Sequence, residues 1–292
     1  MTTIAAPLRI RTVSGGRRWK NRAFSAFVWS CGAVALAPLV IISIYLVARG
    51  FPALSVNLFT KTPAGPLDPE AGGIAQAFVG TAMIVGLATA ISVPMGILAA
   101  IYLSEYGRGR PAAIVRVIAE ILLSTPSIIV GLFIYELIVT RMHTFSAFAG
   151  GLAIATLMWP VVARATEEVL RLVSNDVREA ALALGYPRWR VILRIVIPTA
   201  GTGILTAVML AVARGLGETA PVLVTALGSE YMNTNFFRPT AAVPLSIYAY
   251  ARQPVPTLQT VAWGAALTLL AVVLVLSVGA RFVALRRQRR LG

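Results

Sequence analysis

Six long apolar stretches, separated by shorter polar ones, run through the 292 residues. They cover about residues 24–48, 75–103, 114–139, 148–170, 199–227 and 258–284. Each is at least as long as the roughly 20 residues with which an α-helix crosses the hydrocarbon core of a bilayer. Backbone groups in that core have to bond to one another, and a helix achieves this within one segment. The pattern therefore predicts an all-α polytopic membrane protein with six transmembrane helices, kinked where Pro94 and Pro126 interrupt the second and third stretches.

The polar segments differ in their content of Arg and Lys. Residues 1–23 carry six, the loop 104–116 three, the stretch 164–194 six and the tail 281–292 five, against five in all other loops together. Short loops rich in Arg and Lys remain on the cytoplasmic side. Both termini and the 164–194 stretch are therefore expected to be cytoplasmic. Because the first apolar stretch is about twice as long as the core of a signal peptide, 24–48 is expected to be a retained anchor helix behind a basic tail.

The composition argues against several classes of function. The net charge of +15, on a chain that is 58% hydrophobic, lies mostly in loops where membrane topology accounts for it, so we expect no nucleic-acid partner. One cysteine, Cys31, and one histidine, His143, offer neither a disulfide within the chain nor a metal site. The only lysines are Lys20 and Lys61, and neither ends a Gly-rich loop that would bind the phosphates of ATP.

The segment REAALALGYPRWRVILRIVIP, at 178–198, lies between the fourth and fifth apolar stretches. Its spacing is Glu179-Ala180-Ala181, three residues, Gly185, nine residues, Ile195, one residue, Ile197 and Pro198. This spacing resembles the EAA loop of bacterial ABC-importer permeases, in which Leu is usual where this chain has Ile197. The resemblance implies that the element docks on an ATPase subunit and passes the closing of the ATPase dimer to the membrane helices. A basic amphipathic loop lying on the membrane surface is the competing interpretation.

We expect the EAA element to begin with a short helix. Asp176 can cap its start, and Glu179 falls in the first turn, where a carboxylate suits the positive end of the helix dipole. Ala180 and Ala181 are small enough to let a partner surface approach closely. Gly185, followed by Tyr-Pro, should end this helix, because glycine suits a C-cap and proline cannot continue a helix.

Two charged residues lie deep in the fifth apolar stretch. Arg214 and Glu218 are about sixteen and twenty residues from Pro198, near mid-membrane at a rise of 1.5 Å per residue. An ionised side chain there costs roughly 2.5–3.5 kcal/mol on insertion scales, so such residues face the protein interior or a watery cavity. Their spacing of four allows an ion pair that only stabilises the bundle. Alternatively, Arg214 binds an anionic substrate, because a guanidinium matches two oxygens of phosphate or sulfate.

The carboxylate of Glu218 would repel an oxyanion that has no proton to give. Hydrogen phosphate still carries a proton and sulfate does not, so Glu218 is a hypothesis for the selection of phosphate. A second pair, Arg164 and Glu167, lies near the end of the fourth apolar stretch with a spacing of three. Arg164 either extends its charged group to the membrane interface or forms a lower anion station between Arg214 and the cytoplasm.

Four segments carry a further resemblance: ARGLGETAP at 213–221, TPSIIVGLF at 125–133, RATEEVLR at 164–171 and PLSIY at 244–248. Together they resemble the PstA family, permease subunits of bacterial phosphate importers. The resemblance implies a type I ABC-importer permease fold over residues 74–284, with the coupling EAA loop at 176–198 and a basic cytoplasmic tail at 285–292.

The resemblance also implies partners. A PstC-like permease subunit and two cytoplasmic ATP-binding subunits would complete a phosphate importer in the bacterial inner membrane, and ATP and Mg²⁺ would bind only to the ATP-binding subunits. An extracytoplasmic phosphate-binding protein would deliver the substrate. Its expected landing surface is formed by the two long external segments, 49–74 and 228–257.

Three other functions remain open. A permease for sulfate, molybdate or another oxyanion would carry the same EAA element. An ATP-independent secondary carrier often shows inverted repeats and paired broken helices, and no convincing repeat is visible in this chain. A membrane-embedded enzyme would need converging nucleophiles, acid and base groups or metal ligands, which a chain with one cysteine and one histidine hardly offers.

Overall fold

The computed structural model describes residues 15–63 and 72–291. Within these ranges the chain consists of helices joined by loops, and the only β-pairing is an isolated bridge between Leu227 and Thr240. The expected all-α fold is confirmed. The chain divides into two units, Met1–Ala48 and Arg49–Gly292. Most of the basic tail predicted at 1–23 lies outside the described residues.

Seventeen helical elements follow one another in the described ranges, thirteen of them α-helices. The α-helices are α1 (Gly15–Gly50), α2 (Val56–Thr60), α3 (Ala75–Ile101), α4 (Arg110–Ser124), α5 (Ser127–Ile134), α6 (Thr140–Met142), α7 (Ala147–Arg171), α8 (Asn175–Ala183), α9 (Arg188–Val191), α10 (Ile197–Gly217), α11 (Ala220–Thr225), α12 (Val243–Ala251) and α13 (Pro256–Leu291). A 3₁₀ turn at Phe51–Ala53 and π-helical turns at Tyr102–Tyr106, Tyr135–Val139 and Ile192–Val196 join or extend them.

Five continuous helical segments are long and apolar enough to cross a membrane. They are Trp19–Ala53, Ala75–Tyr106, Ala147–Arg171, Arg188–Gly217 and Pro256–Phe282. A sixth candidate is the pair of segments Arg110–Ser124 and Ser127–Met142, which is bent by 106°. The number of spans is the predicted six when this bent pair is taken as one.

The first unit consists, in its described part, of the long helix α1. None of its most apolar 18-residue window is buried, and large side chains such as Trp29, Leu39 and Ile42 are exposed along it. A long helix with an apolar surface suits the interior of a bilayer, which agrees with an anchor at 24–48.

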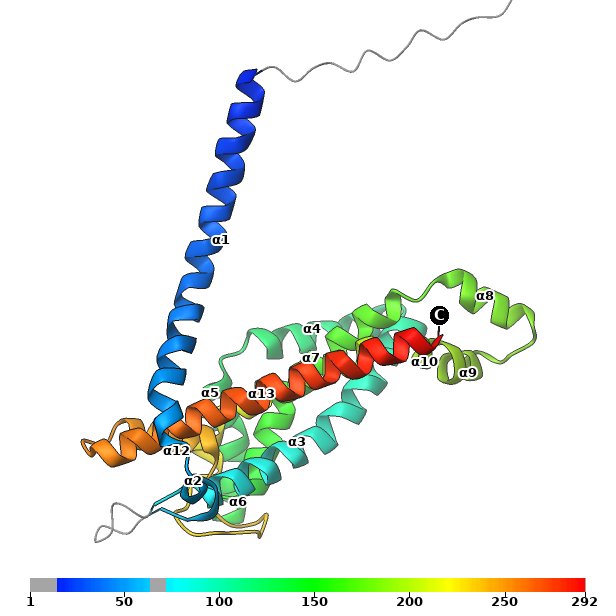
Figure 1. Cartoon of the computed structure of the whole chain (residues 1–292). Helices are drawn as coiled ribbons and strands as arrows, with labels where there is room; N and C mark the ends of the chain where they lie inside the picture. The colour runs from blue at the N-terminus through cyan, green and yellow to red at the C-terminus, as the bar shows by residue number, and fades with distance from the viewer. Residues whose placement is uncertain (1–14, 64–71, 292) are drawn as a thin grey trace, which may run out of the picture. The chain divides into compact units, whose positions relative to one another are not determined.

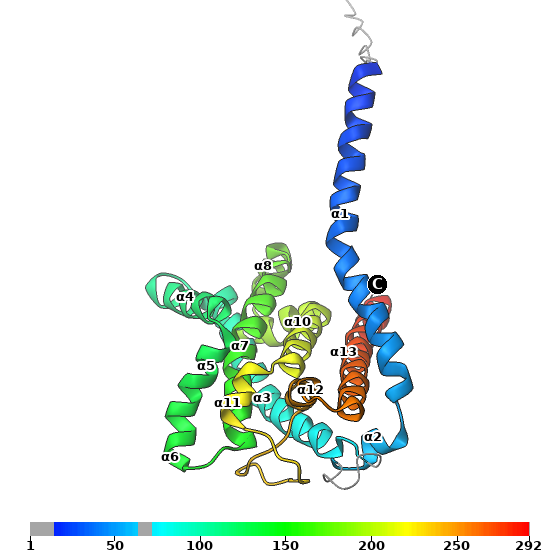
Figure 2. The ribbon, with the colours of Figure 1, turned by 90° about the vertical axis from the view of Figure 1, so that its left-hand side faces the viewer.

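The central helix of the second unit is α7. Of its most apolar window 67% is buried, against 33% for the span that contains α3 and 17% for the span formed by α13. Figure 2 shows α4 and α5 on one side of α7, and α10 followed by α13 on the other. Side chains of α7 are therefore held by neighbours from several helices.

Helices α3 and α7 approach each other very closely. A Cβ atom added at Gly96 of α3 would lie 2.7 Å from the Val162 side chain of α7, whereas carbon atoms pack at about 3.5–4.0 Å. Ile84, Ile154 and Met158 form the buried core next to this contact. The glycine allows the two helices to share one continuous core.

Two predicted spans are interrupted in the structure. The third, predicted as one kinked helix over 114–139, turns by 106° because both Thr125 and Pro126 have extended ψ angles, as is favourable for the residue before a proline. The fifth, predicted to reach 227, ends as a continuous helix at Gly217, and α11 starts only at Ala220. Both breaks leave backbone groups that need other partners inside a membrane.

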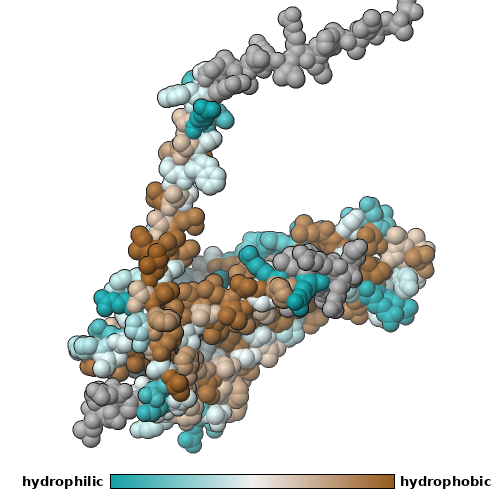
Figure 3. Space-filling model, viewed as in Figure 1, coloured by the Kyte–Doolittle hydropathy of each residue, from teal (hydrophilic) through white to brown (hydrophobic). Residues whose placement is uncertain are grey.

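The short elements gather at two ends of the second unit. Figure 1 shows α8 and α9 at one end, and α2, α6 and α12 at the other. We call the end with α8 and α9 the coupling end. On the face seen in Figure 3, apolar side chains cover much of the middle, and hydrophilic side chains gather towards the ends. Such a distribution is typical of a helix bundle that spans a bilayer.

Candidate functional site

The EAA element forms two short helices, α8 and α9, at the coupling end. The hydroxyl of Ser174 accepts a hydrogen bond from the backbone amide of Asp176 at 3.2 Å and caps α8. The prediction that Asp176 caps this helix is wrong, because Asp176 lies in its first turn. Gly185 follows α8 with a φ of 84°, a conformation that favours glycine, and Pro187 directly precedes α9. The predicted end of the helix is confirmed.

The four residues predicted to contact an ATPase do not all face outwards. Glu179, Ala180 and Gly185 are exposed, whereas Ala181 is buried against Leu170 and Val196. The small side chain of Ala181 therefore allows α8 to pack on its own bundle, which corrects the expectation that it clears space for a partner.

Large apolar side chains around the EAA element are exposed in the single chain. Leu172, Leu184 and Trp189 have exposed fractions of 83%, 79% and 54%. Apolar groups that are exposed together mark a contact with another protein or a membrane. Sequence reasoning missed the two leucines, because they directly follow α7 and α8, and their exposure depends on how the chain turns there.

An ion pair joins α8 to the end of α3. Nε and Nη2 of Arg178 lie 3.2 and 2.9 Å from Oε1 of Glu105, in the π-helical turn after α3. Nη2 of Arg178 also donates a hydrogen bond to the carbonyl oxygen of Leu170, near the end of α7, at 2.8 Å. A displacement of α8 would therefore act directly on the ends of α3 and α7. No local spacing predicts this pair, because its members are 73 positions apart.

A second cluster of charges surrounds Glu167, whose side chain is only 2% exposed. Its carboxylate oxygens lie 3.0 Å from Nε of Arg116, 2.6 Å from Nη2 of Arg171 and 3.4 Å from Nη1 of Arg164. Arg116 belongs to α4 and also donates a hydrogen bond to the carbonyl oxygen of Leu103 at 3.0 Å. The cluster thus joins α4, α7 and the turn after α3.

The structure brings Arg164 and Glu167 together, as their spacing predicts, and adds partners that the sequence did not indicate. Nη2 of Arg164 also lies 3.2 Å from Oε1 of Glu120. An anion that binds Arg164 would have to compete with two carboxylates. This geometry favours a structural role for the pair over the lower anion station.

Arg214 and Glu218 lie at the break between α10 and α11. Nε of Arg214 is 3.3 Å from Oε1 of Glu218, so the ion pair predicted from the spacing is present. Glu218 directly follows α10 and has an extended ψ of 123°. The side chains are 38% and 16% exposed in the single chain. The guanidinium therefore has one carboxylate partner and a surface open to a ligand or a partner subunit.

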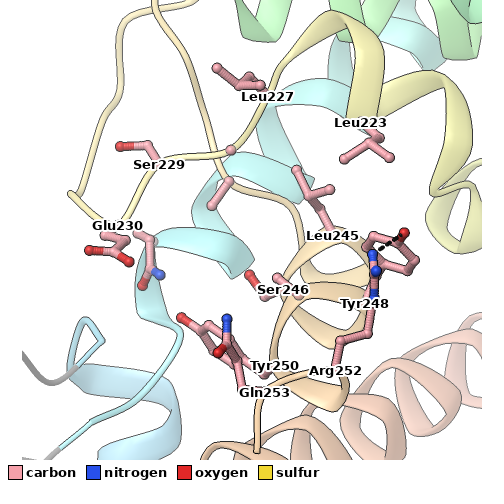
Figure 4. Close-up of a pocket in the computed structure, with 14 residues that line it drawn as sticks. Leu223, Leu227, Ser229, Glu230, Leu245, Ser246, Tyr248, Tyr250, Arg252 and Gln253 are labelled. Atoms are coloured by element: carbon pink, nitrogen blue, oxygen red, sulfur yellow. Dashed lines mark hydrogen bonds between the residues drawn. The ribbon is translucent and has the colours of Figure 1, made fainter. Parts of the chain in front are cut away.

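A pocket of about 690 Å³ lies at the opposite end, between α11, α12 and the segment 227–230. Figure 4 shows Glu230, Tyr250 and Gln253 along one side of it, and Arg252 bonded to the hydroxyl of Tyr248 on the other. The pocket contains none of the residues predicted to bind substrate. It lies mainly within the predicted external segment 228–257.

Tyr250 and Gln76 add hydrogen-bonding groups to this pocket, beside the charged Glu230 and Arg252. Burial raises the pKa of Tyr250 to about 12, the charge of Glu230 contributes to the rise, and a hydrogen bond with the Gln76 side chain opposes it. Tyr250 therefore remains neutral at physiological pH. Oε1 of Gln76 is buried without a hydrogen-bond partner in the described part of the chain.

Comparison with known proteins identifies the family. The family model of binding-protein-dependent transport system inner membrane components matches residues 92–290. The phosphate transport system permease protein PstA of Xylella fastidiosa is 45% identical over 83% of this chain and 85% of its own length. The corresponding protein of Haemophilus influenzae is 46% identical over 81% and 83%, and PstA 1 of Mycobacterium tuberculosis is 41% identical over 97% and 94%. The chain belongs to the PstA family of permeases.

Solved structures show the same fold in more distant proteins. A chain of a bacterial alginate ABC transporter in complex with a pentasaccharide-bound periplasmic protein superposes with a TM-score of 0.65 at 15% identity, covering 92% of this chain and 98% of its own. A chain of the inward-facing MetNI methionine ABC transporter gives 0.56 at 18%, covering 74% and 94%. The predicted fold of a type I ABC-importer permease is therefore confirmed.

Membership of the PstA family has direct consequences for the kind of protein this is. A permease of this family is a multi-span membrane component of a transporter and not an enzyme. It works together with ATPase and binding-protein partners. The ion pair of Arg178 with Glu105 and the arginines around Glu167 are therefore parts of a transport subunit and not of an enzyme active site.

Substitution of Glu167 tests the importance of the buried cluster. Glu167→Gln leaves the guanidinium groups of Arg116, Arg164 and Arg171 without their shared counter-charge. Because these arginines are 28–57% exposed, water screens them, and the loss should be smaller than the about 3–5 kcal/mol of a fully buried pair. We expect a clearly lower thermal unfolding midpoint of the purified protein. Glu120→Gln is the matched control, because Glu120 is 58% exposed and contacts only Arg164, where a pair contributes about 0–1 kcal/mol. Equal shifts for the two variants would contradict a structural role of the cluster.

Proposed function

We propose that this PstA-family chain is a permease subunit of an importer that carries inorganic phosphate across the bacterial cytoplasmic membrane, driven by ATP hydrolysis in separate subunits. One observation carries the proposal: a guanidinium with a single, partly exposed carboxylate partner lies at the break between α10 and α11. That side chain is Arg214, and its partner is Glu218. The names of the relatives support phosphate as the substrate.

Arg214 can exchange its partner without leaving a buried charge unpaired. A guanidinium binds two oxygens of a phosphate with parallel hydrogen bonds, in the same geometry in which it binds a carboxylate. When phosphate approaches, Glu218 is displaced from Arg214 and becomes the acceptor for the proton of hydrogen phosphate. Sulfate has no such proton, so its oxygens would face the negative charge of Glu218. The pair therefore attracts an oxyanion and selects among oxyanions.

The basic segments and the exposed apolar side chains support an orientation of the chain in the membrane and a docking place for its partners. The basic segments place the coupling end and both termini on the cytoplasmic side. One of the two ATP-binding subunits docks there, on the exposed face of α8 and the apolar side chains around it, and these two subunits alone bind ATP and Mg²⁺. A PstC-like permease completes the membrane part. A phosphate-binding protein docks at the opposite end, where the segment 228–257 lies.

Coupling runs through the contacts of α8. ATP-driven movement of α8 reaches α3 through the ion pair of Arg178 with Glu105, and α7 through the hydrogen bond of Arg178 to Leu170. Because α7 is central, its displacement changes the packing of α10, which carries Arg214. Ligand and nucleotide can shift such a bundle between its states only if each binds one state more tightly than the other.

A permease for another oxyanion is the second candidate. The coupling contacts of α8 would serve such a transporter equally well. Glu218 distinguishes a phosphate permease from a permease for another oxyanion, since only an oxyanion that carries a proton can donate a hydrogen bond to its carboxylate.

Removal of the guanidinium tests the substrate path. In proteoliposomes that contain the complete transporter and its binding protein, Arg214→Ala should lower phosphate-stimulated ATP turnover at least about tenfold, because a hydrogen bond to a charged group contributes about 1.5–3 kcal/mol. Arg214→Lys keeps the charge but loses the planar fork, and should give an intermediate rate. A rate of Arg214→Ala within twofold of wild type would contradict the proposed path.

The amide variant of Glu218 tests selectivity. Glu218→Gln removes the negative charge and adds an N–H donor, so an unprotonated oxyanion no longer meets repulsion. We expect sulfate to compete with phosphate uptake at least about tenfold more effectively than in wild type, because two like charges about 4 Å apart repel each other by about 1–4 kcal/mol. Glu120→Gln, which lies outside the break, is the control and should leave the competition unchanged. Unaltered discrimination in Glu218→Gln would rule out this role.

A bulky side chain on α8 tests the docking of the ATP-binding subunits. Ala180 is exposed. Ala180→Phe should prevent close approach of the partner surface, because overpacking costs about 1–3 kcal/mol. Co-purification of the ATP-binding subunits should therefore fall several-fold. Ala251→Phe is the matched control, an exposed alanine of α12 at the opposite end. Equal co-purification of both variants would show that α8 is not the docking element.

A further inference from the structure

A second pocket, about 340 Å³ in volume, opens at the coupling end. It is lined by the turn that follows α3, by the end of α7 and by the first residues of α8 and α9. Four arginines from these segments line it: Arg108, Arg171, Arg178 and Arg188. One water molecule occupies about 30 Å³ in the liquid, so the pocket has room for an ion and several waters.

The positive charge in this pocket exceeds the negative charge. Arg178 is paired with Glu105, the one carboxylate among the lining residues. Arg171 shares Glu167 with two other arginines. Within residues 15–63 and 72–291, Arg188 contacts only the backbone carbonyl of Glu105 and the ring of Tyr106, and Arg108 has no ion pair or hydrogen bond. At least two guanidinium groups therefore lack a counter-charge of their own.

We propose that this pocket binds an oxyanion of the phosphate class, either free inorganic phosphate or the phosphate of a lipid headgroup. Guanidinium groups are the side chains that best match phosphate oxygens, because their N–H donors are planar and permanently charged. The carboxylate of Glu105 does not prevent this, since Arg178 holds it through two hydrogen bonds. None of the four arginines belongs to the substrate pair of Arg214 and Glu218.

An anion in the pocket would act on coupling. The pocket is formed by three segments that have to move relative to one another if α8 transmits the work of an ATPase. A bound oxyanion bridges the turn after α3, the end of α7 and the EAA element, and so stabilises the arrangement seen here against the others. A ligand that prefers one state of a protein shifts the population towards that state. We therefore expect the anion to lower the turnover of the transporter.

The expected effect of the bound oxyanion on transporter turnover rests on the proposed function. The binding of an oxyanion in this pocket does not depend on it. The experiment uses the complete transporter in phosphatidylcholine vesicles, with the ATP-binding subunits facing the bath and phosphate with its binding protein in the lumen. The probe is inorganic phosphate added to the bath, and ADP release is measured. Sodium chloride at the same ionic strength corrects for screening of surface charges.

Arg108→Gln is the test variant and Arg110→Gln its matched control, because both arginines are exposed on the same turn and only Arg108 lines the pocket. Bath phosphate should lower ADP release by wild type and by Arg110→Gln. The phosphate concentration that halves the rate should be about fivefold higher for Arg108→Gln, as for the loss of one partly exposed charge contact.

A second series of vesicles that contain phosphatidylglycerol distinguishes the two sources of the anion. The headgroup is the ligand if this lipid lowers the ATP turnover of wild type and of Arg110→Gln, and bath phosphate does not. In that case the lipid should lower the turnover of Arg108→Gln much less. If neither phosphate nor the lipid acts, or if the two variants respond equally, the proposal is wrong. Loss of the ATP-binding subunits from Arg108→Gln in gel filtration would also overturn it, since the pocket would then receive a side chain of that partner.

Failure of the proposed function gives a different result. If phosphate and its binding protein in the lumen do not stimulate wild-type ATP turnover, the substrate assignment is wrong. The effect of bath phosphate or of the lipid on the basal turnover still reports on the pocket, because basal hydrolysis needs no transported phosphate.

Discussion

A buried carboxylate that is surrounded by guanidinium groups holds the coupling end of this protein together. Glu167 is only 2% exposed, and the guanidinium groups of three arginines lie within 3.4 Å of its carboxylate. One of the three, Arg116, comes from α4, and the others belong to α7. The same principle applies to Glu105, which is buried against Arg178 of α8. Movement of one of these helices would separate a buried carboxylate from an arginine that contacts it, so the ends of the helices are expected to move together.

The pair of Arg214 and Glu218 differs from these clusters in the way that the proposed substrate site requires. It consists of one guanidinium in the last turn of α10 and one carboxylate directly after that helix, both partly exposed. Exchanging the carboxylate for a phosphate therefore exposes no buried charge and breaks no helix. The chain thus has carboxylates that are held by arginines of several helices at the coupling end, and one simple ion pair at the break between α10 and α11.

Arginines at the coupling end outnumber the carboxylates that face them, and this excess has two consequences. The basic segments favour the cytoplasmic side, which is the basis of the proposed orientation. They also leave guanidinium groups next to α8 that are not used by the chain itself. Membership of the PstA family explains the first consequence and is silent on the second, which depends on how the turn after α3, α7 and α8 meet in space.

The sequence by itself determined the features that depend on residues close together in the chain. Six apolar stretches, the end of α8 at Gly185 and the ion pair of Arg214 with Glu218 all follow from length or from a spacing of a few residues. Only the tertiary structure decided which charges meet across long separations, such as Arg178 with Glu105, and that Ala181 turns inwards. It also decided that the third span breaks by 106° instead of bending slightly. The physical reason is that local spacing fixes which side chains share a face of one helix, whereas burial and counter-charges are supplied by other helices whose positions no local pattern contains.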